Sequence, residues 1–152
     1  MEHPPNVDAL EWLLSEVWPK RKSDWRLVVT GAGDFSRFSS AYPDVDFRGF
    51  VSREELADLY DRAAVVLNPT RTGSGFQIKL LEALSYGCNV ISTDFSNPLG
   101  DKIRSSDDPA EFATLVDEAL TSPGSGAFDY ATLYAETCLK LEIFLGLRSQ
   151  GS

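Results

Sequence analysis

The sequence has little positive charge, few cysteines, one histidine and no long apolar run. Its 14 Lys and Arg stand against 23 Asp and Glu, so a net charge of −9 leaves no basic footprint for nucleic acid. No apolar stretch approaches the roughly 20 residues that cross a bilayer, and the N-terminus is not a signal peptide. Cys88, Cys138 and His3 form neither a zinc pattern nor a disulfide framework. We therefore expect a cytoplasmic chain with reduced thiols that binds neither metal nor nucleic acid.

What is present is the composition of an ordinary globular domain. The 152 residues are 43% apolar and 24% charged, which is typical of a chain that folds around its own core. This length supports one core and leaves little room for a second domain of useful size. We expect a single domain over residues 1–148 and a disordered tail over residues 149–152.

Apolar runs and amphipathic patterns alternate along the chain. Two capping boxes, Ser52 with Glu55 and Asp108 with Glu111, mark helix starts, and Gly87 marks a helix end. Continuous apolar strands that alternate with amphipathic helices predict a doubly wound parallel α/β sheet covered by helices on both faces. The strands are expected at 26–30, 45–51, 64–67 and 89–92, and the helices at about 6–18, 53–63, 77–86, 109–119 and 129–145.

Ligands of such sheets bind beyond the carboxyl ends of the strands. This rule selects four loops, at residues 31–34, 49–52, 69–76 and 94–100. The third loop is the most informative, because two glycines stand directly before a predicted helix. A helix N-terminus presents free N–H groups and a partial positive charge, and glycines let phosphate oxygens approach the backbone closely. This loop is therefore where a diphosphate is expected to bind.

Three charged residues flank these glycines. Lys79 and Glu82 share one face of the predicted helix, and Arg71 adds a second cation before the glycines. On spacing alone, Lys79 and Glu82 could equally be an ordinary surface pair, and that alternative stays open. The loop lacks the pattern of an ATP- or GTP-hydrolysing P-loop, and the Gly31-Ala32-Gly33 turn is followed by Ser36 where a dinucleotide fingerprint needs glycine or alanine.

Four segments, read together, resemble one known family. Residues 5–10, 27–33, 45–51 and 73–87 are similar, in order, to the C-terminal, donor-binding half of retaining glycosyltransferases with the GT-B fold, of the family 4-like group 1 type. The resemblance covers about residues 4–121, and its most specific part is 73–87. It implies a Rossmann-like domain that binds a nucleotide-diphosphate sugar and needs no bound metal or cofactor.

The resemblance also implies roles for particular residues. Glu82 takes the position that binds the ribose hydroxyls, and eight positions earlier Ser74 stands where the family has a glutamate on the donor sugar. Backbone around Gly75 holds the diphosphate and sugar, and the loop at 49–51 holds the base. The implied catalytic positions are Lys79 and Ser74, and the implied donor-binding positions are Gly31, Gly33, Gly49, Phe50, Val51, Arg71, Gly73, Gly75, Phe76, Gln77, Ile78 and Glu82.

The implied activity is transfer of a hexose, with retention, from a UDP- or GDP-sugar to a glycan or lipid-linked acceptor. The family places its acceptor site in an N-terminal domain, which we expect to be absent from this chain, so the chain alone is expected to be inactive. The intact protein is expected in the cytoplasm, at the inner face of the membrane. The last helix has apolar residues at Leu133, Tyr134, Leu141 and Leu145, which could support a homodimer, but for most of its length we expect it to cover this domain's own sheet.

Two other functions remain open. A noncatalytic nucleotide-binding or interaction module on the same fold would explain both Ser74 and the missing acceptor domain. A nucleotide-sugar epimerase half would have the same fold, because fold alone does not fix function.

Overall fold

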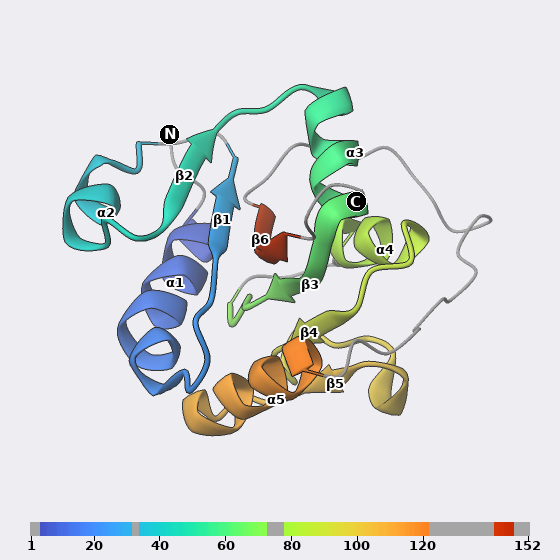
Figure 1. Cartoon of the computed structure of the whole chain (residues 1–152). Coiled ribbons are helices and arrows are strands. Elements are labelled where there is room, and N and C mark those ends of the chain that lie inside the picture. Colours follow the sequence, from blue (N-terminus) through green and yellow to red (C-terminus); the bar gives the residue numbers. More distant parts are fainter. Residues whose placement is uncertain (1–3, 32–33, 73–77, 122–141, 148–152) are drawn as a thin grey trace.

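The computed structural model describes residues 4–31, 34–72, 78–121 and 142–147. They form an α/β domain around a six-stranded sheet of order β2-β1-β6-β3-β4-β5 (Figure 1). The strands β1, β2, β3, β4 and β5 are mutually parallel, and β6 runs antiparallel to both of its neighbours. The strand bounds are β1 Leu27–Thr30, β2 Asp46–Gly49, β3 Ala63–Asn68, β4 Val90–Ser92, β5 Arg104–Ser105 and β6 Glu142–Leu147.

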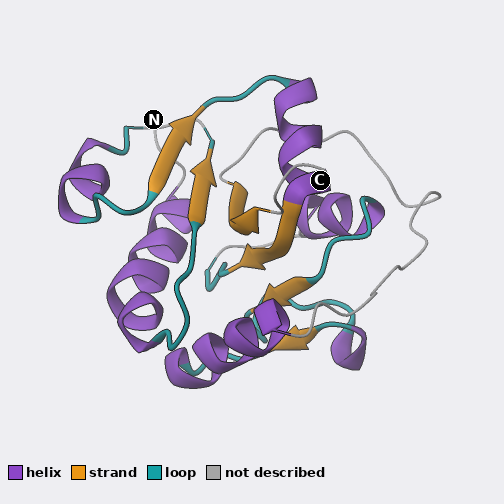
Figure 2. Cartoon of the chain, viewed as in Figure 1, coloured by secondary structure: helices purple, strands orange, loops and turns teal. Residues whose placement is uncertain are grey.

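Helices cover both faces of this sheet, as the alternation of strands and helices predicts (Figure 2). Val28, Val66 and Val90 pack with α3 and α4 on one face, while their neighbours Val29 and Val65 pack with α1 and α5 on the other. The doubly wound α/β architecture is therefore confirmed. The helices are α1 Pro4–Trp12, α2 Ser36–Ala41, α3 Arg53–Arg62, α4 Ile78–Ser85 and α5 Pro109–Thr121, with a π-helix at Leu13–Val17 and 3-10 turns at Trp18–Lys20 and Gly100–Lys102.

The predicted helix ends are built as their sequence signals indicate. The Ser52 hydroxyl accepts a hydrogen bond from the Glu55 N–H at 3.1 Å, and the Asp108 carboxylate accepts one from the Glu111 N–H at 2.9 Å. Gly87 has φ of 75° and donates to the carbonyl of Leu84, while the next N–H reaches Ala83. This pair of bonds is a Schellman motif, which closes the end of α4.

The last predicted element is wrong where the structure describes it. The sequence predicts a helix over 129–145, but residues 142–147 form β6 in the centre of the sheet. A short apolar run fits a strand or a buried helix equally well, and pairing with both β1 and β3 favours the extended form here. The rest of that predicted helix and the expected tail at 149–152 lie outside the described residues. Of the expected dimer surface, Leu133, Tyr134 and Leu141 lie outside them too, and Leu145 lies in the strand β6 instead of a helix.

Candidate functional site

The carboxyl ends of the five parallel strands meet at one edge of the sheet, and two of the predicted loops are joined there. The Gly31 N–H, just after β1, donates to the Gly49 carbonyl at the end of β2, with N and O 2.8 Å apart. Gly31 has φ of 134° and Gly49 has φ of 65°, a region that L side chains rarely adopt. The structure therefore brings together two of the predicted donor-binding glycines, while Gly33 lies outside the described residues.

The loop after β2 contains one buried apolar residue and one exposed aromatic residue. Val51 is buried against the core of α3 and α4, and its neighbour Phe50 is 67% exposed. Phe95, in the loop after β4, is a second exposed aromatic at 56%. Two of the four predicted ligand loops thus offer aromatic surface to solvent beyond the strand ends.

A buried polar cluster ties together the loops that follow β3 and β4. The side-chain amide of Asn68 donates to Ser92 Oγ at 3.2 Å and to Ser96 Oγ at 3.0 Å. Its carbonyl oxygen accepts from the Thr70 hydroxyl at 3.1 Å. All four residues are buried, so these bonds satisfy groups that water does not reach. Sequence reasoning missed this cluster, although polar residues directly after apolar strands were a signal for it.

Thr93 completes the cluster from the other strand. Its hydroxyl donates to the Thr70 carbonyl and lies 2.8 Å from Ser96 Oγ, and its N–H donates to the Asn68 carbonyl at 3.1 Å. Thr93, in the loop after β4, therefore fixes the position of Thr70, the residue before Arg71 at the start of the glycine-rich loop.

Arg71 itself lies toward the helical layer of α1. Its side chain is exposed, and its guanidinium carbon lies 5.4 Å from the centre of the Trp12 ring, a cation–π contact. The predicted positions Gly73, Ser74, Gly75, Phe76 and Gln77 lie outside the described residues. Ile78 and Lys79 form the first turn of α4, where only their backbone is described.

Glu82 is a buried carboxylate on α4. The residue is 7% exposed, and the Tyr60 hydroxyl on α3 donates to its Oε2 at 3.4 Å. Burial raises the pKa of the Glu82 carboxyl, while the Tyr60 hydrogen bond and the charge of Arg53 oppose that rise. Arg71 contacts α1 and Glu82 contacts α3, so these two predicted donor groups contact helices on opposite faces of the sheet.

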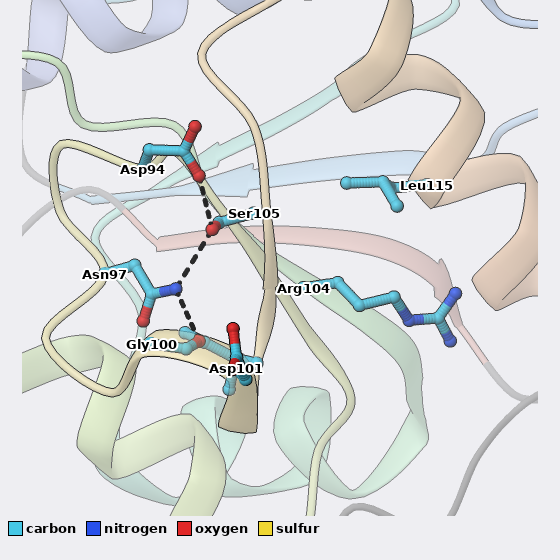
Figure 3. A pocket seen from close by; sticks show the side chains of 8 residues that line it. Asp94, Asn97, Gly100, Asp101, Arg104, Ser105 and Leu115 are labelled. Atoms are coloured by element: carbon cyan, nitrogen blue, oxygen red, sulfur yellow. Dashed lines mark hydrogen bonds between the residues drawn. The ribbon is translucent and has the colours of Figure 1, made fainter.

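An open hollow lies beside the edge strand β5. It has a volume of about 540 Å³ and is lined by parts of β5, α5 and the segment 94–103. Within it the Ser105 hydroxyl donates to Asp94 at 2.5 Å and accepts from the Asn97 amide at 3.0 Å (Figure 3). Arg104 on its rim forms an ion pair with Glu118 at 3.6 Å. Among the residues that the structure describes, none from the loops after β1, β2 or β3 lines this hollow.

Within the part of the chain that the structure describes, no group of three or more His, Cys, Asp or Glu side chains is arranged to hold a metal ion. No helix in those same residues has the length and apolar character needed to cross a membrane.

Comparison with known proteins relates this chain to a family and to an individual relative. The family model described as glycosyl transferases group 1 matches residues 1–122, which contain every predicted site position. An "Uncharacterized 44.6 kDa protein in cps region" of Klebsiella pneumoniae is 28% identical over 105 residues. That alignment covers 62% of this chain and 27% of the Klebsiella protein, so the chain spans only about a quarter of the relative it matches.

Proposed function

This chain belongs to the glycosyl transferases group 1 family, and from that premise we propose that it is the donor-binding domain of a retaining hexosyltransferase. The domain is Rossmann-like, as in glycosyltransferases of this kind. The proposed reaction moves a hexose from a UDP- or GDP-sugar to a glycan or lipid-linked acceptor. The acceptor site is proposed to lie in a second domain, so that this chain alone binds donor without turning it over.

The observation that carries this proposal is the buried carboxylate of Glu82. A carboxylate has two oxygens that accept hydrogen bonds, and the Tyr60 hydroxyl occupies one side of Oε2. The remaining acceptor positions suit vicinal hydroxyl groups such as those of a ribose. Glu82 lies one turn into α4, next to the helix start at which the diphosphate is proposed to bind.

The chemistry assigned to the chain is charge stabilisation. The leaving diphosphate would gain from the free N–H groups at the start of α4 and from Lys79, which stands in that first turn. Ser74 is proposed to donate a hydrogen bond to a hydroxyl of the donor sugar. The joined turns at Gly31 and Gly49 bring backbone N–H and C=O groups close to the same sheet edge, where the base is proposed to bind.

The biological setting is part of the proposal. The name of the Klebsiella relative places that protein in a cps region, which supports a role for this chain in polysaccharide biosynthesis. We propose that the intact protein works in the cytoplasm, at the inner face of the membrane where a lipid-linked acceptor would be available.

A thermal-shift titration of this chain tests the proposed function. UDP, GDP, ADP and their hexose conjugates are added in turn, with AMP as the control ligand. A ligand at 100 times its dissociation constant adds about 2.7 kcal/mol and should raise the melting temperature by roughly 2–4 °C. Glu82→Ala should abolish that shift, and Glu16→Ala, at an exposed position on the first helical segment, should retain it.

A noncatalytic module is the second candidate, and Ser74 favours it because a hydroxyl replaces the family's carboxylate there. Both candidates predict nucleotide binding by this chain. They differ in the full-length protein, where transfer of labelled sugar to a glycan acceptor supports the transferase and its absence supports the module. The transferase proposal fails if no nucleoside diphosphate shifts the chain and the full-length protein transfers no sugar.

A further inference from the structure

Tyr60 and Glu82 form a buried pair between two helices. Tyr60 lies near the end of α3 and is 1% exposed, and Glu82 lies within α4 and is 7% exposed. The phenol hydroxyl donates to Glu82 Oε2 with the two oxygens 3.4 Å apart. A buried carboxylate without such a donor carries a large desolvation penalty, so this contact favours the ionised form.

Packing fixes the direction of the Tyr60 ring. It stacks on the ring of Tyr86, with centroids 4.9 Å apart and an angle of 18° between the planes. The Cys88 thiol donates to the Tyr60 carbonyl at 3.2 Å, which attaches the end of α3 to the residues that follow α4. The hydroxyl therefore approaches Glu82 from a constrained position, because neither the ring nor its backbone is free to turn.

We propose that Tyr60 is a positioning residue for Glu82, whose carboxyl group it orients for the vicinal hydroxyls of a ribonucleoside diphosphate. This inference rests on the proposed function, since Glu82 is there assigned to the ribose. What it adds is the role of Tyr60, which should strengthen the preference of the proposed site for a ribonucleotide, with both hydroxyls present, over its 2′-deoxy counterpart. The preference arises because the carboxylate would lose one hydrogen bond in the deoxy complex while remaining buried.

The charged and titratable groups around Glu82 come from both helices. Tyr60 and Arg53 on α3 each favour the carboxylate, and burial opposes them. Tyr86 and Cys88, which both follow α4, contact Tyr60 by the ring stack and the thiol hydrogen bond and so act on Glu82 only through Tyr60. Removing the Tyr60 hydroxyl leaves burial and Arg53 in place, so the pKa of the Glu82 carboxyl should rise. Preference for ribose should then be lost at a higher pH.

The test uses this chain and compares dissociation constants for UDP and GDP with those for dUDP and dGDP, measured by calorimetry over a pH series. Tyr60→Phe should lower the ribose preference about three- to tenfold, as expected for the loss of one ordinary hydrogen bond. Its affinity for the deoxynucleotide should stay near that of the parent chain, a result that general loosening of the fold would not give. Tyr42→Phe, a change of the same kind at a partly buried tyrosine after α2, is the matched control and should change neither quantity.

The variant Glu82→Gln separates this inference from the proposed function. If Glu82→Gln abolishes the ribose preference and Tyr60→Phe leaves both the preference and its pH profile unchanged, the role of Tyr60 is overturned and the proposed function stands. If the parent chain binds no nucleoside diphosphate, or Glu82→Gln keeps the full preference, the role of Glu82 fails and that of Tyr60 fails with it.

A second variant covers the case in which Tyr60→Phe does not fold. Incorporation of 3-fluorotyrosine at position 60 keeps the ring and hydroxyl and makes the phenol a stronger donor. The pH at which ribose preference is lost should then move downward. An unchanged pH profile in the folded fluorinated chain would overturn the role of Tyr60.

Discussion

The guanidinium carbon of Arg71 lies 5.4 Å from the centre of the Trp12 ring, so a cation of the loop after β3 rests against a helix that begins near the N-terminus. Trp12 is in turn fixed by an edge-on contact with Phe112, with ring centroids 5.2 Å apart. The loop is thus attached at Arg71 to the layer of α1 and α5, and at Thr70 to the loop after β4. These two attachments set how the chain enters the glycine-rich segment.

Replacement of Arg71 tests whether this cation serves the ligand. Arg71→Gln should weaken binding of nucleoside diphosphates about tenfold and reduce the salt dependence of binding, because one cation near the diphosphate is lost. The free energy of unfolding should fall by no more than about 1 kcal/mol, the size of an exposed cation–π contact. Arg37→Gln, which breaks an exposed ion pair with Glu11, is the control and should leave affinity unchanged. Equal affinity in both variants would show that Arg71 only anchors the loop.

Loss of the Thr93 hydroxyl should disturb the polar cluster at the ends of β3 and β4. Thr93→Val keeps the side-chain shape but leaves the buried Thr70 carbonyl without this donor, which should cost about 1–3 kcal/mol of unfolding free energy. Urea denaturation measures the loss. Thr93→Ser retains the hydroxyl and should recover most of the stability. If the valine and serine variants have the same free energy of unfolding, the Thr93 hydroxyl does not contribute to stability.

Glu82 should make stability depend on pH in a direction that is unusual for a carboxyl group. Burial raises its folded-state pKa, so the folded protein binds this proton more tightly than the unfolded chain. Its contribution to stability is fully present below the unfolded pKa and is lost as pH rises through the folded pKa. Glu82→Gln should remove this pH dependence of the unfolding free energy. The variant should also be more stable than the parent chain at neutral pH. Parallel pH profiles for the two proteins would contradict this.

Asp117 should make stability depend on pH in the opposite direction to Glu82. Burial raises its pKa, but hydrogen bonds from Ser23 and Trp25 and from the N–H groups of Lys22 and Ser23 outweigh it, so the pKa is lowered. Stability from this group is present above the unfolded pKa and is lost as pH falls through the folded pKa.

Asp117→Asn removes the charge that holds the turn before β1 against α5. We expect a loss of about 1–3 kcal/mol, toward the lower end because solvent screens a partly exposed carboxylate. Thermal unfolding over an acid pH series checks both size and direction. Asp24→Asn, an exposed change in the same turn, is the control and should stay within about 0.5 kcal/mol of the parent.

Much of the local structure was predictable from short patterns. The caps at Ser52 and Asp108 and the glycine end of α4 involve groups within five residues of each other, and each was predicted and is confirmed. The helix α2 was missed because it lacks an apolar period, and the two-residue strand β5 is too short to give one. Residues 142–145 were predicted to be helical because their apolar run was read without its pairing partners.

The candidate site was predictable in part. The rule that ligands bind beyond parallel strand ends selected the turns at Gly31 and Gly49, and the structure joins them by a hydrogen bond. The partner of Glu82 could not be found in the same way, since Tyr60 lies 22 residues away on another helix. The cluster from Asn68 to Ser96 likewise joins two loops whose spacing says nothing about their contact.

The sequence by itself determined the α/β class, most element positions and the positions of the loops that follow the parallel strands, because helix caps, apolar periods and turn glycines act over a few residues. Only the tertiary structure decided that β6 lies between β1 and β3, that Arg71 rests on Trp12 and that Glu82 is buried beneath Tyr60. Those outcomes depend on which distant surfaces exclude water together, and burial, rather than the residue type alone, raises the pKa of Glu82.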